Sequence, residues 1–390
     1  MPGTPSHNLR LMVFVALTCV LVFEVGVLMA GFRNSLEGNG DFSAFYRTGV
    51  MVRAGELQRV YDPENQLSFD QKLFTSLHRY PPYYFYHPPF EALLLYPFAF
   101  VSYRAAFWIW SIGSFILLVI SGQILSTQFS ELRRAAGIPL TIPLLMFFPV
   151  VMVFLQGQDS ALLLFLVTCA FVELNRGRDW SCGILLALAL FKFQFIIPLA
   201  ALLAWRLSQK FVIAFVTTAA ALFAASWFMV GSAGLASYWA MLVGGTPEMV
   251  SRMPNLRGVV ESLGGPPALG VALAVVLAAW CAIRVTQVKE GAFELAIITS
   301  LLVSHHGHVY DCLLLIIPIF YALEKAVAEN KTWPSFWPAL FFAMLPVYIL
   351  LTRIHATWIF ALTFLALGVT ITRPAASPNS VPVRAGEVAL

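Results

Sequence analysis

Charged side chains are scarce in this chain. Lys, Arg, Asp and Glu make up 11% of its 390 residues, whereas soluble domains carry about 25%. Hydrophobic residues make up 59%, and the mean hydropathy is +0.79. This composition excludes an ordinary soluble domain and indicates a polytopic membrane protein. The formal net charge of +4 is small, and we expect no nucleic acid among the partners.

Cysteine motifs are also lacking. The five cysteines all lie in apolar runs, with no pair of CxxC motifs and no zinc-finger spacing: Cys19, Cys169, Cys182, Cys281 and Cys312. We interpret them as small buried hydrophobes rather than as disulfides. The first apolar run, at 11–32, is too long for a signal-peptide core and lacks an A-x-A site, so it predicts a first span. No internal repeat with a period of about 20–50 residues is present.

Long apolar segments predict an all-α bundle of about twelve transmembrane helices. A helix needs about 20 apolar residues to cross the hydrocarbon core, and shorter helices can cross inside a bundle. The candidates lie near 11–32, 103–125, 139–156, 159–174, 182–191, 193–205, 211–231, 266–284, 292–304, 309–324, 334–352 and 355–372. We therefore expect one membrane domain over 1–372 with a long first extracytoplasmic loop, 33–102, that contains short interfacial helices. A disordered Pro/Ser tail is expected at 373–390.

Cationic residues between the spans predict the orientation, because Lys and Arg favour cytoplasmic loops. Both termini are then cytoplasmic and loop 33–102 faces outward, provided that 180–205 is a hairpin that enters the membrane and returns. The alternative is one long tilted helix at 180–205. Segment 88–101 contains Pro97, and we expect it to be interfacial or re-entrant rather than spanning.

Asp41 is the leading candidate for a catalytic group. It follows the first apolar run and opens a polar, aromatic-rich loop that reaches about Pro89. A carboxylate just outside a span can act as a general base at the lipid–water boundary. The alternative is a helix cap, because Asp is common at the N-cap and the stretch that starts at Phe42 has helical character.

Lys192 lies within an apolar stretch, where an ammonium group needs an anionic partner. No acidic residue lies between Asp179 and Lys192. The partner therefore comes from elsewhere in the fold or from a ligand phosphate. Glu24, a lone acid in the first span, is a candidate for a structural pair, although it can also be protonated.

Two further outer loops carry polar groups suited to a substrate. Gln158 lies in a turn where it can hydrogen-bond a sugar hydroxyl, although Asp159 and Ser160 beside it can also form an ordinary helix cap. Loop 246–258 carries Arg252 and Arg257. Arginine suits phosphate binding, and the alternative is ordinary solvated charge.

Three histidines and an aspartate gather in the turn 304–311, between two apolar spans. A zinc site is conceivable, but His305, His306 and His308 are too close along one turn to converge easily on an ion. A site that hydrogen-bonds phosphate or sugar fits better, because histidine can donate to an anion or shuttle a proton. We therefore expect neither a metal nor a cofactor.

The chain carries a series of motifs in a fixed order: Asp41-Phe42-x-x-Phe45-Tyr46, Gly55 with Tyr61-Asp62-Pro63, Phe85-Tyr86-His87-Pro88-Pro89-Phe90, Gly157-Gln158, Arg176-Gly177-Arg178 with Gly183 and Lys192, Asn255-Leu256-Arg257-Gly258, and Ser304-His305-His306-Gly307-His308-Val309-Tyr310-Asp311. Taken in order, these motifs resemble the polyprenyl-phosphate-dependent glycosyltransferases of the GT-C superfamily, specifically glycosyltransferase family 87, which includes mannosyltransferases. The resemblance covers roughly 9–372.

The resemblance implies an inverting hexosyltransferase with its active site on the extracytoplasmic side of a bacterial inner membrane. Its expected partners are a polyprenyl-phosphate sugar, with mannose favoured, a lipid or glycan acceptor, and membrane lipids. In such enzymes the acidic residue of the first outer loop acts as base, which here is Asp41. We predict a second catalytic role for His308. Substrate or phosphate binding is predicted for Lys192, Arg257, His306, Tyr310, Asp311, Gln158 and His87.

A transporter or flippase of a lipid-linked or small anionic substrate is the competing class. Intramembrane charges and broken helices occur there as well. Such proteins often contain a repeat between their halves, which this sequence lacks.

Overall fold

The computed structural model of the chain describes residues 7–75, 83–244 and 250–372, which contain helices and no strand. The first half contains α1 (His7–Leu36), α2 (Phe42–Arg53), η1 (Leu57–Arg59), α3 (Pro63–Leu73), α4 (Glu91–Leu95), η2 (Tyr96–Phe100), α5 (Tyr103–Gln128), α6 (Ser130–Ala136), α7 (Thr141–Leu145), α8 (Pro149–Gln156) and α9 (Ser160–Asn175). The second half contains α10 (Asp179–Leu188), η3 (Leu190–Lys192), α11 (Phe193–Ala204), α12 (Gln209–Val243), η4 (Val250–Arg252), α13 (Leu256–Ser262), α14 (Pro267–Gln287), α15 (Ala292–Val303), η5 (Val309–Leu315), α16 (Ile316–Ala328), η6 (Trp333–Ala343), α17 (Met344–Arg353) and α18 (Trp358–Thr372). The all-α class is confirmed, and the predicted tail at 373–390 lies outside the described residues.

Five of the described helical segments are long and apolar enough to cross a membrane: Thr18–Leu36 of α1, α5, α12, α14, and Pro334–Arg353 of η6 and α17. A sixth candidate is the pair formed by α10 and Leu190–Ala204, which is bent by 61° at the break between them. The remaining apolar helices, such as α9, α15 and α18, are shorter. Length and composition therefore support five or six spans, and the predicted count of about twelve is not confirmed.

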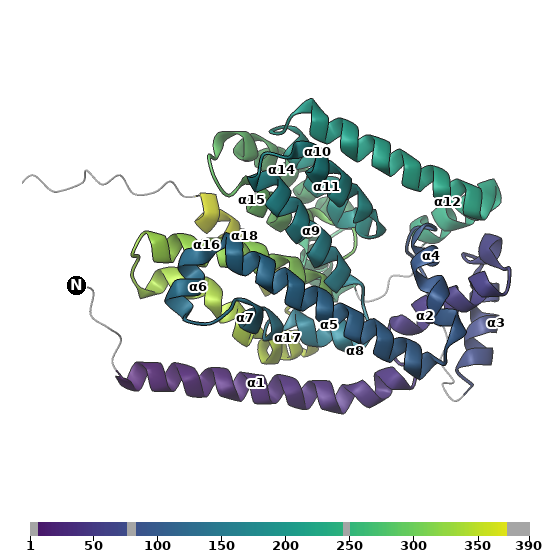
Figure 1. Cartoon of the computed structure of the whole chain (residues 1–390), viewed down its shortest axis with the longest axis horizontal. Coiled ribbons are helices and arrows are strands. Elements are labelled where there is room, and N and C mark those ends of the chain that lie inside the picture. Colours follow the sequence, from purple (N-terminus) through teal and green to yellow (C-terminus); the bar gives the residue numbers. More distant parts are fainter. Residues whose placement is uncertain (1–6, 76–82, 245–249, 373–390) are drawn as a thin grey trace, which may run out of the picture.

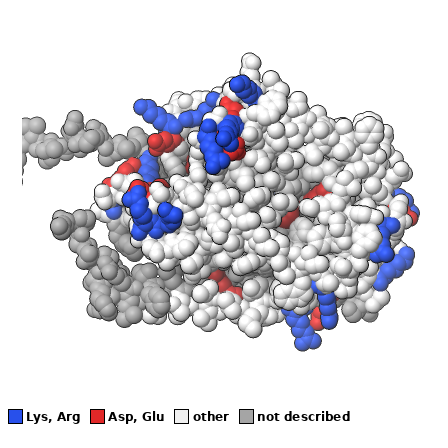
Figure 2. Space-filling model, viewed as in Figure 1, with Lys and Arg blue, Asp and Glu red and all other residues white. Residues whose placement is uncertain are grey.

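The outer surface is suited to lipid. Lys and Arg side chains gather toward the two ends of the molecule, and a broad band with little charge lies between them (Figure 2). Large apolar side chains stand exposed along α5, α12 and α14, among them Trp108, Phe228 and Val276. Exposed apolar faces of this extent mark contact with a membrane or a partner. Together with the apolar helices they indicate a membrane protein.

The segment between α1 and α5 folds into short helices at one end of the bundle. In Figure 1, α5 runs from the neighbourhood of α2 to α6 at the opposite end. An aromatic cluster joins α2 to α5, with Phe42 within 5.6 Å of the rings of Phe107 and Trp110. Phe45 and Phe85 extend this cluster, and burial of such rings dominates core stability. The packing fixes the position of α2, and with it the position of Asp41.

Segment 88–101 forms the short pair α4–η2 and packs on α2. A Cβ at Gly49 of α2 would lie 2.4 Å from the carbonyl oxygen of Leu95, so the two backbones are in close contact. The ten residues Glu91–Phe100 span about 15 Å as a helix, which is about half of the hydrocarbon core. This length favours the interfacial or re-entrant alternative predicted for the segment.

Segment 180–205 turns back on itself. Asp179, at the start of α10, accepts hydrogen bonds from both the backbone nitrogen and the hydroxyl of Ser208, which follows α11. A straight helix would hold these two residues about 40 Å apart. The two ends of the segment therefore lie together with Lys192 between them along the chain, which favours the hairpin over one tilted helix.

Candidate active site

Asp41 lies in the connection between α1 and α2 and is half-buried. Its backbone is helical, and its side chain forms no cap hydrogen bond with the described part of α2. Instead, Asp41 Oδ2 accepts a hydrogen bond from Gln158 Nε2 at 2.5 Å. The cap-only interpretation of Asp41 is therefore wrong, and its carboxylate belongs to a network that reaches the turn between α8 and α9.

Two close contacts fix Asp41 against this turn. The Ser35 hydroxyl donates to the Leu155 carbonyl oxygen at 2.6 Å, which ties the end of α1 to α8. Gly157 has φ +63°, a left-handed conformation that favours glycine, and a Cβ there would lie 2.6 Å from Phe42 Cβ. A glycine at this position therefore lets the Gln158 turn approach the start of α2.

Gln158 connects Asp41 to Lys192. Its amide nitrogen donates to Asp41, and its amide oxygen accepts a hydrogen bond from Lys192 Nζ at 3.0 Å. Gln158 is 3% exposed, and so is Lys192. Buried polar groups are costly unless they are paired, so this arrangement holds both neighbours in fixed positions.

Two carboxylates from the fold supply the partner that Lys192 needs. Its Nζ lies 3.0 Å from Asp159 Oδ1 and 3.3 Å from Asp311 Oδ1. Asp159 and Asp311 are each 1% exposed. These acids, rather than Glu24, pair with the lysine. The Lys192 ammonium group thus forms structural ion pairs with carboxylates of the fold, which is one of the two alternatives predicted.

Asp311 is held by neutral donors as well. The Ser160 hydroxyl donates to its Oδ1 at 3.1 Å, and the backbone nitrogen of His308 donates to its Oδ2 at 3.0 Å. Asp311 therefore connects the start of α9 to the turn before η5. It also fixes the backbone that carries His308.

Tyr310 lies between the lysine and the candidate base. Its ring centroid is 5.3 Å from Lys192 Nζ, and its phenol forms a hydrogen bond with Asp41. Burial and the nearby Asp41 charge raise the pKa of Tyr310 well above its usual value. The phenol therefore keeps its proton at neutral pH, so Asp41 faces two donors, Gln158 and Tyr310.

A second set of charges adjoins Asp159. His87 Nδ1 lies 2.6 Å from Glu91 Oε2 and 3.3 Å from Asp159 Oδ2. Asp159 thus contacts Lys192 through one oxygen and His87 through the other. The hydroxyl of Tyr61 donates to the His87 carbonyl oxygen at 2.6 Å and fixes this part of the loop.

The pKa shifts in this set follow from burial and mutual charge. Burial lowers the pKa of His87, but the Glu91 and Asp159 carboxylates outweigh it and raise that pKa to about 9. Burial raises the pKa of Glu91 to about 7, although His87 opposes the rise. For Asp159, Lys192 and His87 overcome the effect of burial and lower the pKa below its usual range. Asp159 is therefore an ionised acid between two cations.

The histidine turn lies at the edge of this network. The His306 and His308 rings meet edge to face at 4.7 Å, and the His308 ring is 5.4 Å from that of Tyr310. His305 lies apart from them, since the Arg257 guanidinium donates to His305 Nδ1 and to its carbonyl oxygen, each at 3.0 Å. The His306 and His308 rings thus contact each other, whereas the His305 ring contacts Arg257.

Asn255 fixes Arg257 beside the histidine turn. Its amide nitrogen donates to the Ser304 carbonyl oxygen at 3.1 Å, and its amide oxygen accepts from the Gly258 backbone nitrogen at 2.8 Å as the N-cap of α13. The partners that the described structure gives to the Arg257 guanidinium are neutral, all within His305. Burial and the Arg257 charge lower the pKa of His305, which keeps it neutral.

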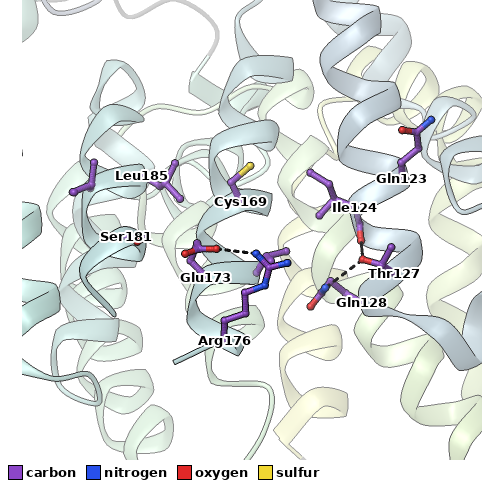
Figure 3. A pocket seen from close by; sticks show the side chains of 11 residues that line it. Gln123, Ile124, Thr127, Gln128, Cys169, Glu173, Arg176, Ser181 and Leu185 are labelled. Atoms are coloured by element: carbon purple, nitrogen blue, oxygen red, sulfur yellow. Dashed lines mark hydrogen bonds and ion pairs between the residues drawn. The ribbon is translucent and has the colours of Figure 1, made fainter. Parts of the chain in front are cut away.

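Two cavities lie at different ends of the bundle. A small one is lined by Asn255, His308 and Asp311 and therefore adjoins the network. A larger one of about 660 Å³ lies between α5, α9 and α10, with Gln128 and Glu173 on its walls (Figure 3). In Figure 3, Glu173 bonds Arg176 within this larger cavity, at the end of α9 remote from Asp159. The larger cavity is thus separate from the candidate active site.

The network brings together most of the residues predicted from the sequence, from segments more than 100 positions apart. Six predicted residues are connected, either directly or through Asp159: Asp41, Gln158, Lys192, Tyr310, Asp311 and His87. The rings of His306 and His308 lie at the edge of the network. Arg257 stands apart from it and contacts His305. Sequence analysis gave Asp159 only a cap role and missed Glu91 and Ser160 as network members. The sequence signal for Glu91 was its isolation in the apolar segment 88–101, where a charge is unexpected.

The fold and the site define an integral membrane protein with a buried ionic network at one end of a helical bundle. The family model for glycosyltransferase family 87 matches residues 85–305, more than half of the chain. The chain therefore belongs to glycosyltransferase family 87. The matched part contains His87, Gln158, Lys192 and Arg257, whereas Asp41 lies before it. No curated protein and no solved structure matches the chain.

Proposed function

We propose that the protein transfers a hexose, with mannose favoured, from a polyprenyl-phosphate sugar to a lipid or glycan acceptor. The transfer inverts the anomeric carbon, and Asp41 acts as general base. The observation that carries this proposal is the state of the Asp41 carboxylate. It is half-buried, released from capping its own helix, and oriented by Gln158 and Tyr310 at the rim of a buried charge network.

In this mechanism the acceptor hydroxyl approaches Asp41, which takes its proton as the oxygen attacks the anomeric carbon. The bond between that carbon and the phosphate oxygen breaks on the opposite face, which produces inversion. The leaving group is a polyprenyl phosphate that gains a second negative charge as this bond breaks, so it needs a nearby cation more than a strong acid. Tyr310 and Gln158 hold Asp41 without competing for the incoming proton, since both donate to it.

Arg257 is the best-supported contact for the donor phosphate. Its described partners are neutral, so its charge is available to an anion, and a guanidinium fork suits phosphate oxygens. His308 and His306 lie between Arg257 and the network and can donate to the same phosphate. A phosphate contact from Lys192 stays a prediction. Such a contact requires the phosphate to compete with Asp159 and Asp311.

We also propose that the network end of the bundle is the extracytoplasmic end. Hydrogen bonds and ion pairs hold together, at this end, the Asp41 connection, the turns at Gln158 and Lys192, and the turn that begins at Ser304. The intervening turns meet at the opposite end, where Asp179 contacts Ser208 and Arg206 donates to the Val285 carbonyl oxygen. This alternation supports about twelve passes, with the short helices crossing inside the bundle. A bacterial inner membrane is the expected location.

The test is turnover by the purified protein in lipid nanodiscs with polyprenyl-phosphate mannose, polyprenyl-phosphate glucose and a panel of lipid and glycan acceptors. The proposal predicts release of polyprenyl phosphate together with a glycosylated acceptor. Movement of an intact lipid-linked sugar across a proteoliposome bilayer, without cleavage, would instead establish the flippase class. An inverted product is expected by NMR of the anomeric proton.

A further inference from the structure

Three potential ligand atoms converge beside the charge network, from segments on either side of α5. They belong to His87, to Glu91 at the start of α4, and to Asp159 before α9, and they lie within 4.8 Å of one another. His87 Nδ1 is 2.6 Å from Glu91 Oε2 and 3.3 Å from Asp159 Oδ2. Histidine and carboxylate together form a donor set for first-row transition metals.

We propose that His87, Glu91 and Asp159 bind a divalent transition-metal cation of the Mn²⁺ or Zn²⁺ type. Imidazole nitrogen with carboxylate oxygen suits both ions, whereas Mg²⁺ and Ca²⁺ prefer oxygen alone. The site differs from the histidine turn at 304–311, for which no metal is expected. The claim of cation binding does not depend on the proposed transfer reaction.

One carboxylate of this set has a buried oxygen without a partner. Glu91 is 3% exposed, and its Oε1 has no hydrogen-bond partner among the described residues. A buried carboxylate oxygen in this condition is costly, because the chain has removed it from water without replacing its hydrogen bonds. A cation bound by the Glu91 carboxylate would give this unpaired oxygen a partner.

The charge balance of the surroundings also favours a cation. In the described structure, the connected network holds four carboxylates, those of Asp41, Glu91, Asp159 and Asp311, against two cationic side chains, Lys192 and the protonated His87. Uncompensated buried charge is strongly unfavourable. A dication beside Asp159 Oδ2 would offset the excess, while Asp159 Oδ1 keeps its contact with Lys192.

The spacing of the donors is close to that of a metal site. Ligand atoms at about 2.1 Å from one cation lie about 3.0–3.4 Å apart in octahedral or tetrahedral geometry. The distance between His87 and Asp159 fits this range. The contact between His87 and Glu91 is shorter because a hydrogen bond occupies it, and it must widen by about 0.5 Å as the cation displaces that proton.

The shell around His87 is ordered and largely apolar. The rings of Phe45 and Phe85 lie 5.0 Å and 5.6 Å from its ring, and Tyr61 holds its carbonyl oxygen. Such a shell limits water and fixes the orientation of a ligand side chain. The side chain of His87 keeps 15% of its surface exposed, which leaves one edge for the cation to enter.

The alternative is that the three groups share a proton, with His87 as an imidazolium between two carboxylates. One experiment distinguishes the two states. Bound metal is stripped from the full-length protein in detergent with EDTA, the chelator is removed, and the protein is titrated with Mn²⁺. The proposal predicts one bound Mn²⁺ per chain by EPR, with ¹⁴N coupling from an imidazole in the electron spin echo. Absence of stoichiometric Mn²⁺ binding, or binding without ¹⁴N coupling, would overturn it.

Glu91→Gln keeps the size of the side chain and removes its charge, and it should weaken Mn²⁺ binding at least about 10-fold. Glu64→Gln, on the exposed side of α3, is the matched control and should bind as the native chain does. His87→Gln should abolish the ¹⁴N coupling, which supplies an answer even if Glu91→Gln does not fold. Equal affinity in Glu91→Gln and the native chain contradicts the site. Mn²⁺ binding without sugar transfer would contradict the proposed function alone.

Discussion

Asp41 and Lys192 are joined through one side-chain amide, that of Gln158. Its nitrogen donates to Asp41 Oδ2, and its oxygen accepts from Lys192 at 3.0 Å. An amide is suited to this position because it offers a donor to the anion and an acceptor to the cation at once. The candidate base is thereby linked to the buried ion pairs while its own charge remains uncompensated by direct contact with the lysine.

Gln158→Ala should lower kcat by about 100-fold with a small change in KM, because Asp41 loses a donor that fixes its position. Gln156→Ala, two residues earlier at the end of α8, is the control and should retain activity. The measurement is a steady-state kinetic comparison with saturating acceptor. Equal kcat values for the two variants would show that the amide link plays no part in catalysis.

Lys192→Met should lower the free energy of unfolding by about 3–5 kcal/mol, because Asp159 and Asp311 are left buried without their cation. Thermal unfolding in detergent gives the comparison. Lys210→Met, at the exposed start of α12, should leave Tm nearly unchanged. If both variants have the same Tm as the native chain, Lys192 is not the structural partner of these acids.

Gly157→Ala should be more damaging than Gly177→Ala. Both glycines have positive φ, +63° and +69°, so each substitution carries a strain of about 1–2 kcal/mol. At Gly177 no described atom lies within 4 Å of the new Cβ, whereas at Gly157 it would meet Phe42 Cβ at 2.6 Å. Gly157→Ala should therefore also displace Gln158 and reduce transfer. Equal Tm and equal kcat in the two variants would contradict the close contact.

Tyr310→Phe should lower kcat by about 10-fold, which corresponds to the loss of one hydrogen bond to a charged group. The raised pKa of Tyr310 means that the phenol stays protonated in the working range, so the native pH–rate profile should show no loss that depends on its ionisation. An unchanged kcat in the variant would assign Tyr310 a packing role.

The helical class and most residues of the candidate site could be predicted from the sequence, for a physical reason. Apolar length marks helices in a membrane protein, and an ionisable group such as Lys192 stands out in an apolar stretch because its burial is costly. The number of membrane spans was harder to predict from the sequence. Helices such as α9 and α15 are shorter than the bilayer core, and only tertiary contacts reveal where their ends meet.

The pairing within the site could not be predicted. Asp159 was given a cap role because an aspartate before a helix usually has that role, but its carboxylate instead contacts Lys192 and His87. These contacts join residues 72 and 33 positions apart, and no local pattern encodes them. Glu91 was missed for the same reason, because only the folded chain brings it and His87 together with Asp159.

The central claim is that the Asp41 carboxylate accepts the proton of the acceptor hydroxyl. The most direct test is transfer by Asp41→Asn, beside Asp62→Asn, whose asparagine can still cap α3 as the native aspartate does. The account predicts that Asp41→Asn retains its Tm and donor binding but loses about 10²–10⁴-fold in transfer rate, whereas Asp62→Asn keeps its activity. Native turnover by folded Asp41→Asn would contradict the account.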